Sequence, residues 1–213
     1  LISSRALDEI TKIHRTAGEI IWRWGGSQNE FNFINDYPFT HQHSIRSLGD
    51  NRYLLYDNGN FSAQYTGTMN ISRAVEYRLD TNFMTAEKVW EFVHPDSLFT
   101  PTIGGVQRLP NGNTLINFGN LKWLNLGSII TEVNTNNQIV FQLEYDTTGN
   151  IYRAYKFDWF FSAGPPPSTI QEHSTNKELF KVTDLLGRET KGKKNEPLFY
   201  IYDDGTVEKR IVI

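Results

Sequence analysis

The sequence of 213 residues contains no cysteine, no excess of basic side chains and no long apolar run. The lack of cysteine excludes disulfide bonds and thiolate metal sites, but it does not settle the compartment, because many exported bacterial proteins also lack cysteine. A net charge of −3 provides no basic stripe of the kind that nucleic acids require. Since no apolar segment approaches the ~20 residues of a membrane-spanning helix, we expect no transmembrane segment.

The start of the given sequence also lacks the pattern of a leader peptide. It opens at Leu1, within a segment typical of a strand, and no basic and apolar leader precedes that segment. We therefore expect the sequence to be the C-terminal part of a longer protein. Its length suffices for one core and a small second module.

The sequence does contain internal repeats. Residues 48–55 (LGDNRYLL) recur as residues 109–116 (LPNGNTLI), and both read as a turn followed by an apolar strand. A second unit, an alternating strand followed by a strand rich in β-branched and aromatic residues, begins at residues 4–13, 72–79 and 128–133. No segment has a helical stripe. Four short strands per repeat are typical of a propeller blade, so we predict an all-β propeller fragment with blades of four antiparallel strands.

The repeats also predict the domain organisation. Residues 1–161 are expected to hold two nearly complete blades, the outer half of one before them and the start of another at residues 151–160. Because propellers close with roughly 4–8 blades, the remaining blades are expected upstream of Leu1. Residues 162–174 read as a proline-rich linker, and residues 175–213 as a small C-terminal β module.

One stretch combines residues suited to anion chemistry. His41 and His43 stand one residue apart, a strand ends in an Asp-Asn-Gly turn at residues 57–59, and Arg73 opens the next strand. Imidazole accepts or donates a proton or acts as a nucleophile, and guanidinium fits tetrahedral oxyanions. We expect His43 and Arg73 to face a common mouth and to move an anionic group. The alternative, histidines that only hydrogen-bond loop carbonyls, is equally open from the residues alone.

Three further residues have competing interpretations. His41 lies on the same side of an extended chain as His43, which suits a metal pair without a third ligand, a loop-capping role or a surface role. Arg5 repeats the position of Arg73 and either reaches the same channel or forms a salt bridge with a neighbouring acid. His94 precedes a proline, so its backbone is extended or in a turn, where a histidine is more often structural than catalytic. No metal site is expected.

Several stretches occur together in one order: SSRALDEI (3–10), TAGEIIWRWGG (16–26), QHS (42–44), LLYDNG (54–59), SRAVEY (72–77) and LPNGNTLI (109–116). With them the first 160 residues resemble the C-terminal blades of the bacterial arylsulfotransferase family, which are propeller enzymes. The resemblance implies transfer of a sulfuryl group from a phenolic sulfate ester to a phenolic acceptor. It implies ping-pong chemistry through a sulfated histidine, without an adenylyl-sulfate donor and without a cofactor.

The resemblance also assigns roles to residues of this chain. His43 matches the histidine of the family's Gln-His-Asp motif, with Ser44 in place of the aspartate, and Arg73 matches the arginine of its Ser-Arg motif. It implies that Arg73 neutralises the sulfuryl oxygens while His43 holds or protonates the bridging phenolic oxygen. His41, Arg5 and His94 are then expected to bind substrate.

One position departs from the family. The family's nucleophilic histidine lies one blade further on, and the internal repeat carries His43 onto Gly104, which has no side chain. An alternative is therefore a catalytically inactive propeller that binds sulfated or aromatic ligands at the cell surface. A third possibility is a structural adhesion propeller without a small-molecule site.

The end of the chain carries a second resemblance. Residues 181–189 (KVTDLLGRE) and 205–212 (GTVEKRIV) resemble the C-terminal sorting domain of the type IX secretion system of Bacteroidetes. The resemblance implies that this secretion machinery is a partner and that the protein is secreted or held at the cell surface after crossing the outer membrane. An Asp-Asp-Gly turn at residues 203–205 predicts a hairpin within this module.

Overall fold

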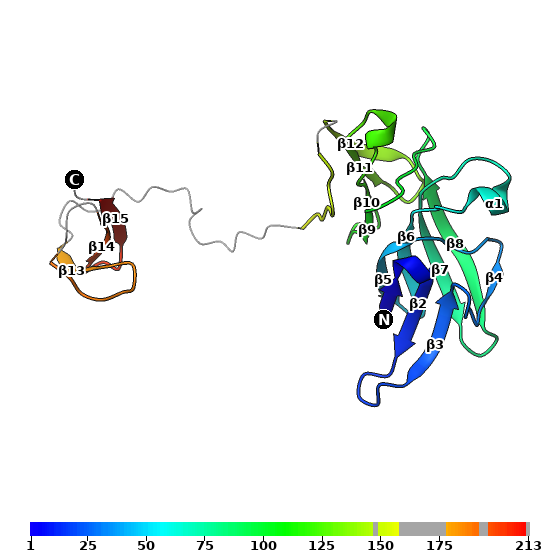
Figure 1. Cartoon of the computed structure of the whole chain (residues 1–213), viewed down its shortest axis with the longest axis horizontal. Coiled ribbons are helices and arrows are strands. Elements are labelled where there is room, and N and C mark those ends of the chain that lie inside the picture. The colour runs from blue at the N-terminus through cyan, green and yellow to red at the C-terminus, as the bar shows by residue number, and fades with distance from the viewer. Residues whose placement is uncertain (147–148, 158–177, 192–195, 212–213) are drawn as a thin grey trace. The chain divides into compact units, whose positions relative to one another are not determined.

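The computed structural model shown in Figure 1 describes residues 1–146, 149–157, 178–191 and 196–211. The chain divides into two units, Leu1–Asp158 and Trp159–Ile213. The expected linker, residues 162–174, lies outside the described residues.

The first unit contains three sheets (Figure 1). The first sheet is β1 (Ile2–Ser4), β2 (Glu9–Ile13) and β3 (Ile20–Gly25). The middle sheet has the order β4-β8-β7-β6-β5, with β4 (Asn32–Ile34), β5 (His43–Gly49), β6 (Arg52–Asp57), β7 (Arg73–Asp80) and β8 (Thr85–Val93). The third sheet is β9 (Gly105–Arg108), β10 (Thr114–Phe118), β11 (Ser128–Val133) and β12 (Ile139–Tyr145).

Helical structure in the described residues is limited to short pieces, namely the 3₁₀ turns η1 (Arg5–Leu7) and η2 (Lys122–Leu124) and the helix α1 (Ala63–Thr66). The prediction of an all-β chain is therefore confirmed. Strands β5 to β8 and β9 to β12 each form an antiparallel four-stranded meander, the pattern of a propeller blade.

The repeated turn that the sequence shows has a conformational cause. Between β5 and β6, Asp50 and Asn51 take φ values of 47° and 55°, and in the corresponding turn before β10, Gly112 takes 87°. Positive φ suits Asn, Asp and Gly, and consecutive positive values are typical of the tight turns that join twisted antiparallel strands. The start of β6 is thus set by two consecutive residues at positive φ and the start of β10 by one glycine, so the repeated sequence forms turns of different type.

Strand β6 is buried on both faces, which explains its unbroken apolar run. Tyr53 and Leu55 contribute to a core cluster with Trp22 and Trp24 of β3. Leu54 and Tyr56 contribute to a second cluster with residues of β9 to β11, namely Val106, Ile116, Phe118, Ile129 and Val133. Because side chains alternate along a strand, one strand supplies both interfaces between the three sheets.

Some elements differ from the sequence-based expectation. The first sheet has three strands where an outer half-blade was expected, and residues 151–157, expected to start a further blade, form no strand. Strand β4 was not predicted. It pairs in parallel with β8, and the Asn32 N–H donates to the carbonyl of Met84 at 2.8 Å. A three-residue strand has too little alternation to stand out in the sequence.

The second unit contains one antiparallel sheet of β13 (Leu179–Thr183), β14 (Pro197–Tyr202) and β15 (Val207–Ile211). The predicted hairpin is confirmed: Gly205 has φ of 80°, and its N–H donates to the Tyr202 carbonyl at 3.1 Å. Within the described residues of the chain, no helix has both the length and the apolar character needed to cross a membrane.

Candidate functional site

Strand β6 separates the two residues that were expected to act together. His43 is paired with Tyr56, and Tyr56 with Ala74, whereas Asp57 is paired with Arg73. Directly opposed residues share a face and successive residues alternate, so His43 lies on the Tyr56 face of the middle sheet and Arg73 on the other. The expected convergence of His43 and Arg73 on one mouth is therefore not what the structure shows.

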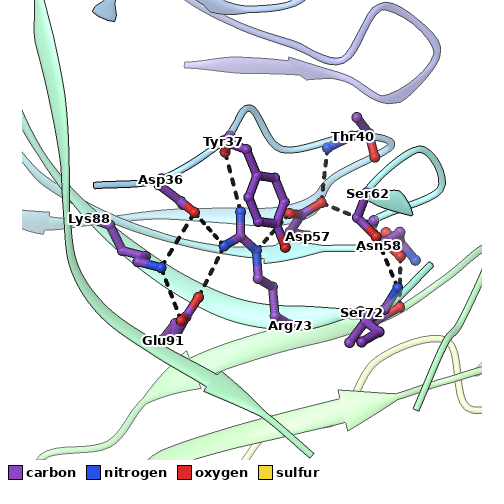
Figure 2. Close-up of polar contacts among 12 residues, drawn as sticks. Asp36, Tyr37, Thr40, Asp57, Asn58, Ser62, Ser72, Arg73, Lys88 and Glu91 are labelled. Atoms are coloured by element: carbon purple, nitrogen blue, oxygen red, sulfur yellow. Dashed lines mark hydrogen bonds and ion pairs between the residues drawn. The ribbon is translucent and has the colours of Figure 1, made fainter. Parts of the chain in front are cut away.

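Arg73 is buried with 1% of its surface exposed, and all five of its N–H donors have acceptors. Nε donates to Asp57 at 3.0 Å, Nη1 to Asp36 at 2.7 Å and to Glu91 at 3.0 Å. Nη2 donates at 3.4 Å to both the Tyr37 carbonyl and the Tyr77 hydroxyl. Figure 2 shows the guanidinium between Asp36, Tyr37, Asp57 and Glu91. No donor of Arg73 is left for a sulfuryl oxygen.

The charges around Arg73 also argue against an anion site. Three carboxylates surround it, and Lys88 pairs with two of them, Asp36 at 3.4 Å and Glu91 at 3.0 Å. The Tyr37 ring covers the guanidinium with its centroid 4.0 Å away (Figure 2). Burial raises the pKa of Asp57, although Arg73 and backbone N–H groups lower it. A cluster with an excess of carboxylates repels a sulfate ester, so this network is built to hold structure rather than an anion.

His43 has a different environment, half-buried and oriented through a single ring nitrogen. Its Nδ1 lies 2.6 Å from Oδ1 of Asn58 and 3.1 Å from the carbonyl oxygen of His41. Both neighbours are acceptors, so Nδ1 carries the proton. Nε2 makes no hydrogen bond with the described part of the chain and keeps its lone pair. Burial is the main cause that lowers the pKa of His43; the hydrogen bonds to Asn58 and to the His41 carbonyl raise it, the charges of Arg5 and Arg153 lower it, and the net shift is downward.

This protonation state changes the role expected of His43. A neutral imidazole with a lone pair on Nε2 accepts a proton or attacks an electrophile, whereas the resemblance had suggested that His43 holds or protonates the phenolic oxygen. Ser44, which replaces the family's aspartate, does not orient His43. Its hydroxyl lies 3.4 Å from both the N and the O of Val106 in β9.

Arg5 is the arginine that the fold brings towards His43. Its Nη2 donates to the carbonyl of Pro101 at 2.8 Å, and its Nε is buried without a partner. Asn58 donates to the carbonyls of the adjoining Thr100 and Ile103, both at 2.7 Å. The loop at residues 100–103 thus braces Arg5 and the partner of His43 together. The salt bridge of Arg5 to a neighbouring acid, one of its two expected roles, does not form.

The chain next to His43 ties the same elements together. Gln42 is buried, and its Nε2 donates to the Glu9 carbonyl and to the Ser3 hydroxyl, each at 3.1 Å. These two partners flank the η1 turn that carries Arg5. The start of β5 is therefore fixed against the segment that supplies the arginine, which explains how residues nearly forty positions apart meet.

Two more arginines, Arg46 and Arg153, lie on this side. Arg46 pairs with Leu54 and His43 with Tyr56, because a bulge at Ser44, with φ of 58°, shifts the register. His43 and Arg46 therefore share a face, although strict alternation would separate them. Arg46 donates to the Tyr155 hydroxyl at 2.6 Å, and Arg153 approaches the same hydroxyl at 3.4 Å.

The other two histidines of the expected site have structural partners. His41 has φ of 57°, stands before β5 rather than on it, and its Nδ1 lies 3.0 Å from Asp8. His94 is 3% exposed, its Nδ1 accepts from the Asp96 N–H at 3.2 Å and its Nε2 lies 3.1 Å from Gln142. Both ring nitrogens of His94 are thus occupied, and its expected contact with substrate is not supported.

Gly104 cannot be the counterpart of a histidine in this fold. It has φ of 129°, and a Cβ placed on it would lie 2.3 Å from the ring of Tyr56. A side chain at this position would enter the core next to Tyr56 instead of a ligand site. Among the described residues, no group of three or more His, Asp or Glu side chains is arranged to hold a metal ion.

The blade-like meanders and the two buried interfaces between the sheets define a propeller-like protein. Its candidate site lies at the strand ends, where His43 begins the first strand of one blade. The sequence model of the arylsulfotransferase (ASST) family matches residues 1–156, and the chain belongs to this family. No curated protein matches the sequence.

Proposed function

We propose that this chain supplies part of the active site of an aryl-sulfate sulfotransferase, which moves a sulfuryl group from a phenolic sulfate ester to a phenolic acceptor. Membership of the ASST family supports a sulfotransferase in general. In this reaction the S–O bond to the donor phenol breaks and an S–O bond to the acceptor forms. The proton of the acceptor hydroxyl ends on the phenol that leaves, so no adenylyl-sulfate donor or cofactor is needed.

His43 is the proposed working group. The observation that carries the proposal is the free lone pair on Nε2 of a neutral imidazole, within the electrostatic influence of an arginine that makes one hydrogen bond in the described part of the chain. Such a nitrogen takes the acceptor's proton, or attacks sulfur in the covalent route that the family resemblance implies. Both steps require the imidazole to be neutral, which is the state that its surroundings favour.

Arg5 is the proposed partner of the sulfuryl group. Its Nη2 donates to the Pro101 carbonyl and its buried Nε has no partner, so within the described part of the chain Arg5 makes one hydrogen bond. Fixed donors near the sulfuryl oxygens stabilise the charge that shifts towards the leaving phenol. His41, whose carbonyl accepts from His43 and whose Nε2 makes no hydrogen bond with the described residues, is proposed to border the same site.

Arg73 is proposed as a positioning residue. It holds Asp57, which accepts from the N–H groups of Thr40 and Gly59 at 2.9 Å each. These bonds fix the turn in which Asn58, the partner of His43, directly follows Asp57. Loss of Arg73 is then expected to reduce activity through the position of His43, without a contact of its own to substrate.

The test is turnover of an aryl sulfate donor with a phenol acceptor by the full-length protein. His43→Ala is expected to abolish turnover. Arg78→Ala is the matched control, because Arg78 is exposed on β7, and its turnover is expected to equal that of the wild type. Wild-type turnover by His43→Ala would overturn the proposed role of His43.

A second candidate function is binding without turnover, which the structure of residue 104 favours. Gly104 accepts no side chain, and both ring nitrogens of His94 have partners. Of the other histidines of the expected site, this leaves His41 alone as a second candidate for catalysis among the described residues. Aryl sulfate binding by calorimetry without any product would favour this alternative. Turnover that His43→Ala abolishes would exclude it.

We further propose that the second unit directs export through the type IX secretion system to the outside of the cell. Its Asp-x-x-Gly-Arg element forms a closed turn: Asp184 Oδ1 accepts from the N–H groups of Leu186 and Arg188 at 2.8 and 3.0 Å. Gly187 has φ of 78°, and Nε of Arg188 donates to Oδ2 of Asp184 at 2.7 Å. Each residue of the motif thus has a role in presenting one rigid turn.

Localisation of the full-length protein in its native bacterium tests this proposal. Deletion of residues 159–213 is expected to leave the protein inside the outer membrane, and Asp184→Ala is expected to reduce export. Asp203→Ala, in the other turn of the same unit, controls for a general loss of stability. Unchanged secretion of the deletion variant would contradict the proposal.

A further inference from the structure

Asn58 is the residue that decides which nitrogen of His43 faces outward. Its side chain is 0% exposed and makes contacts through both ends of the amide. The Nδ2 group donates to the carbonyls of Thr100 and Ile103, each at 2.7 Å. A carbonyl can only accept, so the orientation of the amide is fixed and Oδ1 must face His43.

The fixed amide in turn fixes the imidazole. Oδ1 of Asn58 lies 2.6 Å from Nδ1 of His43, shorter than the 3.1 Å from Nδ1 to the His41 carbonyl. Neither neighbour can donate to Nδ1, so the proton is held there and the lone pair is left on Nε2. Without such a fixed acceptor, a neutral imidazole exchanges between two tautomers, and a hydrogen on Nε2 would block both proton acceptance and attack on sulfur.

We propose that Asn58 is a positioning residue that locks His43 in the Nδ1–H tautomer and so presents Nε2 to the sulfuryl ester. The identity of the ester rests on the proposed function, but the effect of Asn58 on the tautomer of His43 does not depend on that function. The loop at residues 100–103 supplies the two carbonyls that hold Asn58 and also accepts from Arg5 through Pro101. One loop therefore sets the tautomer of the histidine and the place of the arginine.

The direct test is nitrogen NMR of the wild-type protein labelled with ¹⁵N-histidine. At a pH above the pKa of His43, its Nδ1 is expected to give the shift of a protonated ring nitrogen and its Nε2 that of a bare one. The opposite pattern, or an even mixture of the two tautomers, would overturn the proposal. This measurement uses the wild-type protein without substrate, so its outcome does not depend on whether a variant folds.

Variants of Asn58 extend the test to catalysis. Asn58→Ala is expected to give a mixture of tautomers and to lower kcat by about 10–100-fold with little change in KM, as loss of a group that orients a working histidine commonly does. Asn58→Asp places a carboxylate next to Nδ1 and is expected to raise the pKa of His43, which shifts the acidic limb of the pH–rate profile upward.

Asn60 provides the matched control. It belongs to the same turn and donates to the Pro101 carbonyl at 3.1 Å, but it makes no hydrogen bond with His43, whose Nδ1 has Asn58 and the His41 carbonyl as its partners. Asn60→Ala is expected to keep the tautomer, and Asn60→Asp is expected to move the pH–rate profile less than Asn58→Asp does. Equal effects at both positions would reduce Asn58 to a structural role and overturn the proposal. The expected tautomer together with no turnover of any aryl sulfate would instead reject the proposed function alone.

Discussion

Asp57 and Asn58 are neighbours in the chain, yet their side chains serve opposite faces of one sheet. Asp57 accepts from Arg73 at 3.0 Å, and Asn58 accepts from His43 at 2.6 Å. The peptide between them joins a buried ion-pair network to the candidate site. A displacement of the turn on one face therefore reaches the other face over a single residue, and this is the route by which we expect Arg73 to influence the position of His43.

Arg73→Ala is expected to destabilise the protein by about 3–5 kcal/mol, because it leaves buried carboxylates without their main counter-charge. Urea unfolding measures this loss. Arg73→Lys is expected to recover only part of it, since an ammonium group cannot reach five acceptors arranged for a planar guanidinium. Arg78→Ala, on the exposed side of β7, is the control and is expected to stay within about 0.5 kcal/mol of the wild type. A loss below 1 kcal/mol for Arg73→Ala would show that the network contributes little.

The stability of the protein is expected to depend on the protonation of His43. Burial holds its folded-state pKa below the ordinary value of 6.5, so the unfolded chain binds a proton more readily than the folded one. The free energy of unfolding is then expected to fall as the pH drops below 6.5 towards the folded-state pKa.

Unfolding of the wild type and of His43→Gln across this range isolates the contribution, because glutamine can donate to Asn58 but does not titrate. The wild type is expected to lose more stability than the variant as the pH is lowered. Parallel curves for the two proteins would show that His43 is not the group responsible.

Gly104→Ala is expected to destabilise the protein by about 1–3 kcal/mol through overpacking, with backbone strain added to it. The new methyl group would lie 2.3 Å from the Tyr56 ring, on a residue with φ of 129°. Gly105→Ala is the control from the next position, where the nearest atom to an added Cβ is 3.8 Å away and φ is ordinary. Thermal or urea unfolding of the pair measures the difference, and equal stabilities would refute this account of Gly104.

Arg5→Ala is expected to lower kcat/KM for an aryl sulfate by about 10–100-fold, the equivalent of ~1.5–3 kcal/mol for hydrogen bonds to a charged group. Arg5→Lys is expected to keep the charge and recover part of the loss. The folded state should tolerate both, because Arg5 is half-buried and makes one hydrogen bond. Steady-state kinetics of the full-length variants, beside Arg78→Ala, would reveal whether Arg5 serves substrate, and an unchanged kcat/KM would remove it from the site.

Local sequence patterns predicted the elements of this fold well where backbone preference decides. The turn residues Asp50, Asn51 and Gly112 take the positive φ values that their side chains tolerate. The Asp-Gly hairpin of the second unit forms at the expected place. Strand β4 was missed because its pairing comes from β8, far along the chain, and not from its own three residues.

The candidate site was predicted only in part. The motifs drew attention to His43 and Arg5, and the structure adds that His43 is half-buried with a free ring nitrogen and that Asn58, its partner, and Arg5 both bond to one loop. The matching Ser-Arg motif did not reveal that Arg73 meets carboxylates from three other segments. Arg46 escaped notice because the bulge at Ser44 reverses the face that simple alternation assigns to it.

The sequence alone determined the all-β class, the repeated turns and the family, because these depend on alternation, turn chemistry and motif order within short stretches. Only the tertiary structure decided how many hydrogen bonds each arginine makes and which nitrogen of His43 keeps its lone pair. Those properties depend on acceptors that arrive from distant segments, such as the carbonyls of Thr100 and Pro101, and no local pattern encodes where such acceptors will lie.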